Sequence, residues 1–276
     1  MSEKDIINNT PAPRTRLSLA EDLRQLGVES GMTLITHSSL SALGWVCGGA
    51  VTVVQALMDV VTPAGTIVMP TQSGGYSDPA QWAHPPIPQD WWQTVRDMLP
   101  IYDPRITPTS GMGQVVEVFR IWPGALRSAH PQVSFAAWGQ HAEQIIANHT
   151  LTNGLGESSP LARIYDLDGQ ILLLGVGYDR NTSFHLAEYR APGATAETLG
   201  TPYFENGQRV WKTYQDIVID SDIFPQIGSA FEQTGQVTTG RVGSAETRFF
   251  SQRAGVDFAQ QWLTAKRSSE STGAHI

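Results

Sequence analysis

The sequence predicts an α/β fold that also contains antiparallel strands, and three observations lead to this class. Residues 33–69 have the pattern strand, loop, helix, strand, which is the order of a βαβ unit. The apolar run Gln170–Gly175 is short and uninterrupted, as is typical of a strand buried on both faces. Short alternating segments within residues 209–219 favour an antiparallel hairpin.

The elements of the first half follow from local signals in chain order. Ser18–Glu21 has the pattern of a capping box that opens a short helix, and Gly27 is placed to close it. We then expect a strand over 33–37, a Gly-rich turn over 44–49, an apolar helix over 50–61 and a buried strand over 66–69. Residues 72–108 are rich in Gly, Pro and Trp and have little periodicity, which predicts a long functional loop.

The second half predicts further helices and strands without an interruption. We expect helices over about 113–122, 139–147 and 160–165, a strand over 170–175, a helix that starts close to Thr182, a hairpin of 209–214 with 216–219, and helices over 223–232 and 251–265. The chain contains neither an internal repeat nor a long linker. We therefore predict one domain over 16–265, with flexible ends over 1–15 and 266–276.

Composition narrows the class of protein. The chain has 276 residues, of which 41% are hydrophobic and 16% charged, so it can bury a sizeable core. Its 18 Lys and Arg against 26 Asp and Glu give a formal charge of −8, which disfavours a nucleic-acid binder and suits a cationic small substrate. Ordinary surface charge that keeps the protein in solution is the alternative interpretation. The single cysteine, Cys47, excludes an internal disulfide and a multi-cysteine zinc site.

Two features of the sequence bear on the cellular location of the protein. The N-terminal segment Met1–Arg16 is polar and lacks the apolar core of a signal peptide. The longest apolar runs are too short to cross a bilayer. We therefore expect a cytoplasmic protein that does not bind membranes.

The first candidate site lies between the strand at 33–37 and the helix at 50–61. His37–Leu40 is followed by the glycine-rich stretch Gly44–Gly49. Free N–H groups and the positive end of a helix dipole favour an anion at such a junction. The spacing matches neither the dinucleotide fingerprint nor the Walker loop, so a tight structural turn is the alternative.

Two further polar clusters could contact a ligand. Thr107–Gly113 is rich in hydroxyl groups and glycine and leads into a helix, although a capped helix would have the same pattern. Arg127–Pro131 combines a cation, a hydroxyl and an imidazole, and its alternative interpretation is a surface loop. Either cluster could bind a phosphate or another polar group.

The segment Asp179–Glu188 carries the clearest acid–base pattern. If Thr182 caps the helix, His185 lies in its first turn and Glu188 three residues later on the same face. A carboxylate beside a neutral imidazole is the arrangement that a general base requires. A histidine that only packs in the core is the alternative. The histidines lack the spacing of metal ligands, so we expect no metal.

Taken together, the clusters resemble the aminoglycoside 3-N-acetyltransferase family, also called the antibiotic N-acetyltransferases. The resemblance extends from about Leu19 to Leu263. Its motifs are His37–Leu40 with Gly48-Gly49, Thr107–Thr109 with Met112-Gly113, Glu117 with Phe119-Arg120, Arg127-Ser128 with His130-Pro131, Ser134–Gly139, Gly156–Leu161, and Leu172–Gly175 followed by Asn181-Thr182 and His185–Glu188.

The resemblance implies a single three-layer α/β domain, with a central mixed sheet flanked by helices and unlike the GNAT acetyltransferases. It implies acetyl-CoA as donor, an aminoglycoside amine as acceptor, and no metal. By motif match, the residues implied in coenzyme binding are His37, Ser38, Ser39, Leu40, Gly44, Trp45, Val46, Gly48, Gly49, Thr109, Ser110, Gly111, Met112, Gly113, Ser128 and His130. His185 matches the family's catalytic histidine, and Glu188 and Asp179 match acidic residues beside it.

This resemblance fits the chemistry of amide formation. We hypothesise that His185 deprotonates the amine and that Glu188 or Asp179 orients His185. Thr182 or a loop N–H would stabilise the oxyanion, and the amine would attack directly without an acyl-enzyme.

The acceptor site should be acidic because aminoglycosides are polycations. We expect Tyr76, Asp78, Glu157 and Glu205 to line it. The Trp-rich loop Tyr76–Trp92 could form a wall for the sugar rings, and a loop that covers an apolar cluster is the alternative. Such activity would confer antibiotic resistance. The protein would be a monomer or a homodimer.

Three alternatives stay open. The enzyme could acetylate a different metabolite amine with the same donor, because fold and donor do not determine the acceptor. The chain could be a coenzyme A-binding module without turnover. Cys47 could be the nucleophile of a hydrolase, since a helix N-terminus favours a thiolate.

Overall fold

The computed structural model describes residues 2–273, with side chains through residue 269, and shows a seven-stranded mixed sheet. The order is β3-β4-β2-β1-β5-β9-β8. The strands are β1 (Thr33–Ser38), β2 (Thr66–Pro70), β3 (Leu126–Arg127), β4 (Phe135–Gly139), β5 (Gln170–Leu174), β8 (Thr238–Val242) and β9 (Ala245–Ser251). The central strands β2, β1 and β5 are parallel. Strands β4 and β9 pair antiparallel to β2 and β5, and the edge strands β3 and β8 pair antiparallel to β4 and β9. The predicted βαβ unit and buried strand are therefore present at the centre of the sheet.

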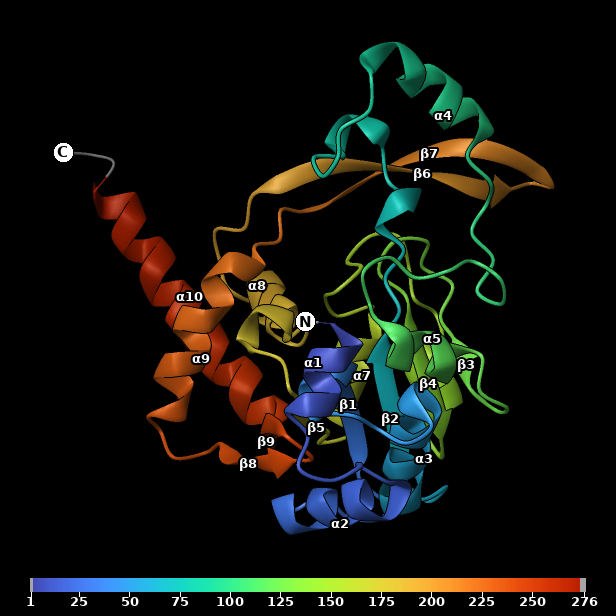
Figure 1. The fold of residues 1–276 in the computed structure, drawn as a ribbon. Helices are drawn as coiled ribbons and strands as arrows, with labels where there is room; N and C mark the ends of the chain where they lie inside the picture. Colours follow the sequence, from blue (N-terminus) through green and yellow to red (C-terminus); the bar gives the residue numbers. More distant parts are fainter. Residues whose placement is uncertain (1, 274–276) are drawn as a thin grey trace.

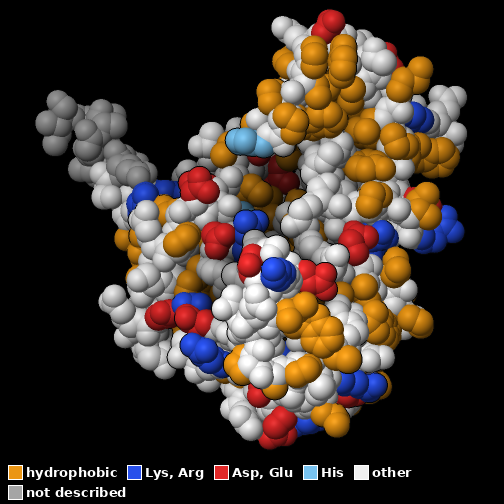
Figure 2. All heavy atoms as spheres, viewed as in Figure 1, with side chains coloured by type: hydrophobic (Ala, Val, Ile, Leu, Met, Phe, Trp, Pro, Cys, Tyr) orange, Lys and Arg blue, Asp and Glu red, His pale blue; other side chains and the backbone are white. Residues whose placement is uncertain are grey.

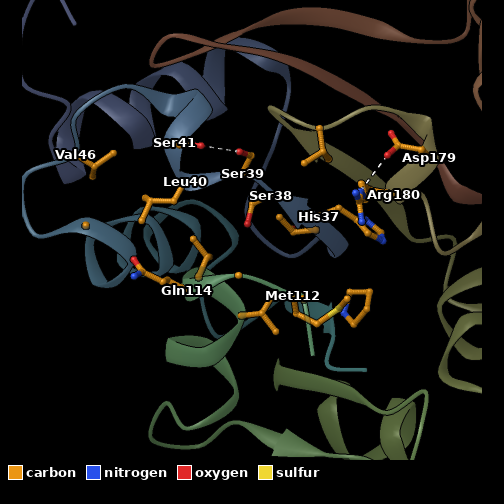
Figure 3. Close-up of a pocket in the computed structure, with 18 of the residues that line it drawn as sticks. His37, Ser38, Ser39, Leu40, Ser41, Val46, Met112, Gln114, Asp179 and Arg180 are labelled. Carbon is orange, nitrogen blue, oxygen red and sulfur yellow. Dashed lines mark hydrogen bonds and ion pairs between the residues drawn. The ribbon is translucent and has the colours of Figure 1, made fainter. Parts of the chain in front are cut away.

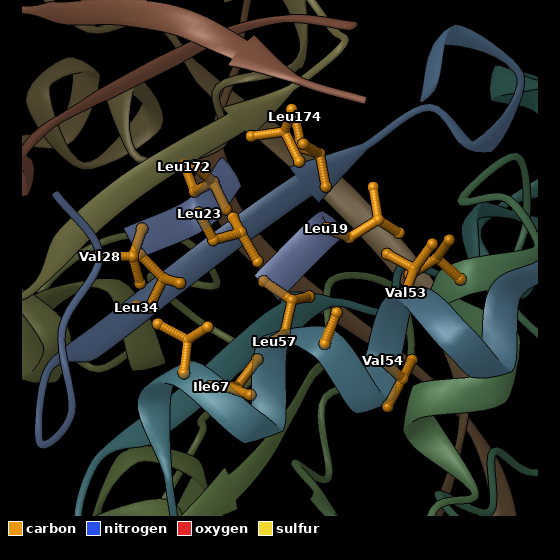
Figure 4. Packing of buried hydrophobic residues seen from close by; sticks show 14 of the residues in the cluster. Leu19, Leu23, Val28, Leu34, Val53, Val54, Leu57, Ile67, Leu172 and Leu174 are labelled. Atoms are coloured by element: carbon orange, nitrogen blue, oxygen red, sulfur yellow. The ribbon is translucent and has the colours of Figure 1, made fainter. Parts of the chain in front are cut away.

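Helices cover both faces of this sheet and make three layers (Figure 1). The helices are α2 (Arg16–Leu26), α3 (Gly49–Val61) and α5 (Gln114–Arg120), and, packed with the other face, α6 (Ala142–Ile146), α7 (Pro160–Asp166), α8 (Phe184–Arg190), α9 (Phe224–Glu232) and α10 (Gln252–Gly273). Alternate residues of β1 enter two separate cores, because Leu34 packs with α2 and α3 while Ile35 packs with α7 and α8. Figure 4 shows Leu23 and Leu57 meeting Leu34 in the first core. The predicted three-layer α/β domain is confirmed.

Helix α2 begins three residues before the predicted position. Thr15 is its N-cap and Ser18 occupies the third helical position, and each side chain bonds to the backbone N–H of the other. The predicted capping box at Ser18–Glu21 is therefore wrong in register. Gly27 ends the helix with φ of 106°, as predicted, because this left-handed conformation is easily reached only by glycine.

The two ends of the chain, which we predicted to be flexible, contain helices. Helix α1 (Glu3–Asn8) has a reciprocal cap between Ser2 and Asp5, and the backbone of Arg14 bonds to Trp45 and Cys47. At the other end, α10 continues through the predicted end and reaches Gly273. Residues 274–276 lie outside the described part of the chain. The N-terminal segment therefore lies against the glycine-rich loop.

A hairpin and a short helix extend from the domain as an arm, made of α4 (Trp92–Met98), β6 (Ala196–Glu205) and β7 (Gln208–Ile217) (Figure 1). The predicted hairpin is wrong in register, because both predicted strands fall largely within β7. The actual turn is Asn206-Gly207, with φ of 51° and 80°, which suits a tight two-residue hairpin. Figure 2 shows hydrophobic side chains gathered on this arm, where Met98 and Phe204 are exposed.

The other differences between the observed and the predicted elements concern the lengths of helices and the strands near one edge of the sheet. The aperiodic stretch 72–108 contains α4 and three short 3₁₀ turns, Gly74–Tyr76, Pro79–Gln81 and Gln89–Trp91. The helix expected over 139–147 is shorter, because residues 135–139 form β4. The prediction also missed β8 and β9. Within the described residues, no helix is both long and apolar enough to cross a membrane.

Candidate active site

A cleft of about 920 Å³ opens at the carboxyl ends of β1, β2 and β5. Parallel α/β sheets place ligand sites at this edge because the following loops diverge there. Figure 3 shows His37–Ser41, at and after the end of β1, on one side of the cleft, with Met112 and Gln114 on another. The lining residues are Glu3, Ile6, Thr36, His37, Ser38, Ser39, Leu40, Ser41, Gly44, Trp45, Val46, Gly49, Pro70, Gln72, Gly111, Met112, Gly113, Gln114, Val115, Val116, Val176, Asp179, Arg180, Thr182, His185 and Ser221.

His185 and Glu188 form a buried pair at the inner wall of this cleft. His185 Nδ1 lies 2.5 Å from Glu188 Oε2, because both residues lie on one face of α8 three positions apart. The other oxygen, Glu188 Oε1, accepts a hydrogen bond of 2.9 Å from the backbone N–H of Asp220. The side chains of His185 and Glu188 are 9% and 3% exposed. The carboxylate thus holds one ring nitrogen, and Nε2 is the nitrogen left for a ligand.

Asp179 lines the cleft but does not orient His185. Its Oδ2 is 3.0 Å from Arg180 Nε, so it pairs with a guanidinium. Of the two acids predicted to orient His185, the structure brings only Glu188 into contact with it.

Thr182 lines the cleft but does not cap α8. The helix begins at Phe184, its N-cap is Ser183, and no side chain caps it. Thr182 Oγ1 lies instead 3.1 Å from Nε2 of His37. The predicted N-cap was wrong because a contact with a distant strand fixes this threonine.

His37 is buried at the end of β1 and faces the same pocket as His185. Burial, with a smaller contribution from His185, lowers the pKa of His37 to about 3. A coenzyme contact was predicted for this residue. Its hydrogen bonds are to Thr182.

The glycine-rich loop contributes fewer free donors than the sequence suggested. The N–H of Trp45 donates to Thr10 Oγ1 at 2.8 Å, and that of Cys47 to the carbonyl of Arg14 at 2.9 Å. The loop residues Gly44, Trp45, Val46 and Gly49 still line the cleft, but Gly48 does not. Cys47 is exposed and lies outside the lining, so nothing places its thiol against His185.

The second predicted cluster is divided between the cleft and the structural core. Gly111, Met112 and Gly113 line the cleft. Thr109 turns away, since its N–H and hydroxyl both donate to Glu117 Oε1, at 2.7 and 2.5 Å. Ser110 donates its N–H to the carbonyl of Gln72 and is not part of the lining. Thr109 and Ser110 therefore shape the loop that carries Gly111–Gly113.

Ser128 and His130, for which a contact with the coenzyme was predicted, are buried and do not belong to the lining of the cleft. Ser128 Oγ bonds to Nδ1 of His149 at 2.9 Å and accepts the N–H of Phe135 at 2.9 Å. His130 Nδ1 accepts two backbone N–H groups, and burial lowers its pKa to about 4. The physical reason is that β3 pairs with β4, which directs the following turn into the core.

The residues predicted for the acceptor site do not line the cleft. Asp78, Glu157 and Glu205 are each paired with a cation, at 2.8 Å from Arg96, 2.6 Å from Arg190 and 2.6 Å from Lys212 respectively. Tyr76 accepts a hydrogen bond from Thr107 at 3.5 Å. The sequence alone did not show that these carboxylates have cationic neighbours, and their role at the acceptor site stays a prediction.

The cleft also contains residues that the sequence did not indicate. Gln72 and Val176 follow β2 and β5 closely, so the strand-end rule could have found them. Glu3 and Ile6 come from α1, which the sequence suggested to be a flexible end. Arg180 is the one guanidinium in this lining. The described residues contain no group of three or more His, Cys, Asp or Glu placed to hold a metal ion.

Comparisons with known proteins agree with one another. A family model described as aminoglycoside 3-N-acetyltransferase matches residues 35–264. The chain is 49% identical over 261 residues to the SPbeta prophage-derived aminoglycoside N(3')-acetyltransferase-like protein YokD of Bacillus subtilis (strain 168), covering 94% of this chain and 96% of YokD. The crystal structure of YokD superposes with a TM-score of 0.95 at 48% identity, over 96% of this chain and 98% of that one.

Two more distant solved structures are similar to this chain and contain ligands. AAC-IIIb in a binary complex with CoASH has a TM-score of 0.82 at 30% identity, covering 92% of this chain and 98% of that one. AAC-VIa bound to sisomicin has a TM-score of 0.83 at 33% identity, covering 92% and 99%. The shared fold therefore spans almost the whole of each chain.

Proposed function

Because this chain belongs to the aminoglycoside 3-N-acetyltransferase family, we propose that it transfers an acetyl group from acetyl-CoA to the 3-amino group of an aminoglycoside. The proposal includes a cytoplasmic location and a role in resistance to that antibiotic. The observation that carries it is the His185–Glu188 pair, which opens onto a cleft large enough for a ligand. The CoASH and sisomicin bound to the related structures support the two substrate classes.

His185 acts as the general base in this proposal. An amine attacks a carbonyl carbon only in its neutral form, so a proton must leave its nitrogen. Nε2 of His185 accepts that proton, while Glu188 holds Nδ1–H and stabilises the imidazolium. As the C–N bond forms and the C–S bond breaks, the proton returns from Nε2 to the leaving sulfur. The step needs no acyl-enzyme and no external co-reactant.

Thr182 supplies a donor for the developing negative charge. Its hydroxyl lines the cleft, and its carbonyl accepts the N–H of His185, so the two residues share one turn of backbone. A hydroxyl that is positioned before the reaction can stabilise an oxyanion without reorganisation. That Thr182 and His185 both line the cleft supports these two roles.

The remaining lining fits the coenzyme and a cationic acceptor. The Thr36 hydroxyl is buried and lacks a hydrogen-bond partner among the described residues, as expected where a ligand completes the site. Ser38–Leu40 and Gly111–Gly113 offer backbone and hydroxyl groups, and Arg180 offers a charge that complements phosphate. Carboxylates that can face an ammonium group are those of Glu3 and Asp179.

Thiol release from acetyl-CoA with a panel of aminoglycosides tests the proposal. The unmodified protein should release thiol only when an amine acceptor is present, and His185→Ala should lose at least about 100-fold in kcat because the base is gone. The matched control is His141→Ala, since His141 lies outside the cleft and makes no cap contact with α6. Near-complete turnover by His185→Ala would contradict the assignment of the base.

A second candidate is an N-acetyltransferase that acts on a different metabolite amine. Two observations support it: the acids expected at the acceptor site are paired with cations, and the similar protein YokD is described as acetyltransferase-like. The same panel separates the two candidates if it also includes non-antibiotic diamines. Turnover of a diamine without turnover of any aminoglycoside would favour this second function.

A further inference from the structure

His37 contacts Thr182 across a long separation in sequence. Its Nε2 lies 3.2 Å from the backbone nitrogen of Thr182 and 3.1 Å from Thr182 Oγ1, although 145 residues separate the two. His37 is at the end of the central strand β1, whereas Thr182 lies on the short connection before α8. The contact thus ties that connection to the rigid centre of the sheet.

Local bonds alone hold Thr182 less firmly. Its N–H is shared between His37 Nε2 and the carbonyl of Arg180, which is 2.9 Å away. The other local contact is the bond from the N–H of His185 to the carbonyl of Thr182 at 3.1 Å. The bond to Arg180 and the bond from His185 both lie within the same short turn, so they would move with that turn. His37 supplies the bond from outside the turn.

The geometry at Nε2 selects one tautomer of His37. The backbone N–H of Thr182 points at Nε2, and a backbone nitrogen can only donate, so Nε2 must carry a lone pair. The proton of a neutral ring is then on Nδ1. Nδ1 is buried and has no hydrogen-bond partner among the described residues. It therefore favours neither tautomer, and the contact at Nε2 determines which tautomer is present.

The hydroxyl of Thr182 is left with freedom that matters for catalysis. Since Nε2 carries no proton, it cannot donate to Thr182 Oγ1, and the hydroxyl itself is the only possible donor in that contact. The single lone pair of Nε2 is already used by the N–H of Thr182. The hydroxyl hydrogen can therefore rotate toward a ligand without leaving Nε2 unpaired.

We infer that His37, as a neutral Nδ1–H imidazole, is a positioning residue that fixes Thr182 and leaves the Thr182 hydroxyl free to donate to the oxyanion. The inference rests on the proposed function for the role of Thr182. It assigns His37 a contact with Thr182 in place of the contact with the coenzyme that the sequence suggested. His37 acts through Thr182 and touches no reacting atom.

A pair of amide substitutions separates this role from general packing. In His37→Gln the amide oxygen reaches the position of Nε2 and can accept the N–H of Thr182, whereas in His37→Asn the shorter amide reaches only the position of Nδ1. We expect His37→Asn to lower kcat about 10- to 100-fold, because small displacements of a catalytic donor are costly. His37→Gln should stay within about threefold of the unmodified enzyme. The KM for acetyl-CoA should change less than about threefold in both.

A double-mutant cycle tests whether His37 acts through Thr182. Thr182→Val removes the hydroxyl and should lower kcat about 10²- to 10³-fold, as loss of an oxyanion donor does. Adding His37→Asn to Thr182→Val should cause little further loss, because the group that His37 positions is already absent. Multiplicative losses in the double variant would overturn the inference, as would equal losses in His37→Asn and His37→Gln.

The tautomer of His37 can also be measured in the unmodified protein. This test does not depend on activity and still applies if the His37→Asn or Thr182→Val variants fail to fold. Nitrogen NMR of the protein with labelled histidine reports which ring nitrogen of His37 carries the proton, and His37→Gln provides the assignment. We expect protonated Nδ1 and bare Nε2. A protonated Nε2 would overturn the inference even if acetyl transfer is confirmed. Absence of acetyl transfer with the predicted tautomer present would instead count against the proposed function.

Discussion

Two buried histidines of this protein each bond to a side-chain oxygen, yet only one of them can do acid–base chemistry. His149 Nδ1 bonds to Ser128 Oγ at 2.9 Å, and its Nε2 bonds to the carbonyl of Gly154 at 2.7 Å. His185 Nδ1 bonds to Glu188, and its ring lines the cleft. Both nitrogens of His149 are used inside the protein, whereas His185 keeps one for a ligand. A histidine with a polar partner is a candidate base only if a ring nitrogen reaches the site.

The largest effect should come from changing Glu188, the partner of the histidine that lines the cleft. Glu188→Gln keeps the shape of the side chain but replaces the carboxylate that bonds to Nδ1 of His185 and that, in the proposed mechanism, stabilises the imidazolium. We expect kcat to fall about 10²- to 10⁴-fold, with a smaller change in KM. Steady-state thiol release measures both. A loss of less than threefold would mean that the His185–Glu188 pair is no more catalytic than the Ser128–His149 pair.

The buried pair Ser128–His149 should instead contribute to the stability of the fold. Ser128→Ala leaves His149 Nδ1 and the N–H of Phe135 without their partner in the core, which should cost about 1–3 kcal/mol in the free energy of unfolding. The kcat of the folded variant should stay within about twofold. Urea denaturation together with thiol release checks both values, and a loss of kcat without a loss of stability would reverse the assignment of the two pairs.

Acid should weaken the fold through the buried histidines. Burial lowers the pKa of His149 to about 3 and that of His130 to about 4, from about 6.5 for a histidine in water. Below pH 6.5 the unfolded chain binds protons that the folded chain does not, so stability falls as pH decreases toward 4. Each histidine contributes up to about 1.4 kcal/mol per pH unit. Unfolding measured between pH 7 and 4 should show this slope.

A matched variant isolates the contribution of one histidine to that slope. His149→Gln removes one titrating group, so its stability should depend less steeply on pH than that of the unmodified protein. Equal slopes in the two proteins would show that His149 does not resist protonation in the folded state.

The smallest effect should follow from breaking an exposed ion pair of the predicted acceptor site. Glu157→Gln removes the partner of Arg190, and this glutamate is 61% exposed. An exposed pair contributes at most about 1 kcal/mol to stability. Because Glu157 lies outside the cleft, the KM for the amine should also stay within about twofold. A tenfold rise in that KM would restore Glu157 to the acceptor site.

The sequence predicted those parts of the fold whose signals lie within one short stretch of chain. The unit β1-α3-β2 was predicted because its apolar periodicity and its glycine turn lie within one short stretch. The strands β8 and β9 were missed, since they carry alternating polar residues and are defined by pairing with each other and with β5. The hairpin register was wrong because the Asn206-Gly207 turn was not recognised.

In the site, too, contacts between residues close in sequence were predicted, and contacts between distant residues were not. His185 and Glu188 could be paired from the sequence because three positions on a helix bring side chains together. The contact of Glu188 with the N–H of Asp220, and that of His37 with Thr182, span 32 and 145 residues and have no local signal. Ser128 resembles a ligand-binding serine in its local sequence, but β3 places it in the core.

Chemical rescue tests most directly the claim that the free nitrogen of His185 is the base. His185→Gly should lose turnover in the thiol-release assay, and added imidazole should restore part of it in proportion to its concentration, because the reaction lacks only a proton acceptor. His149→Gly serves as the control and should show no response to imidazole. Turnover by His185→Gly equal to that of the unmodified enzyme would contradict the account.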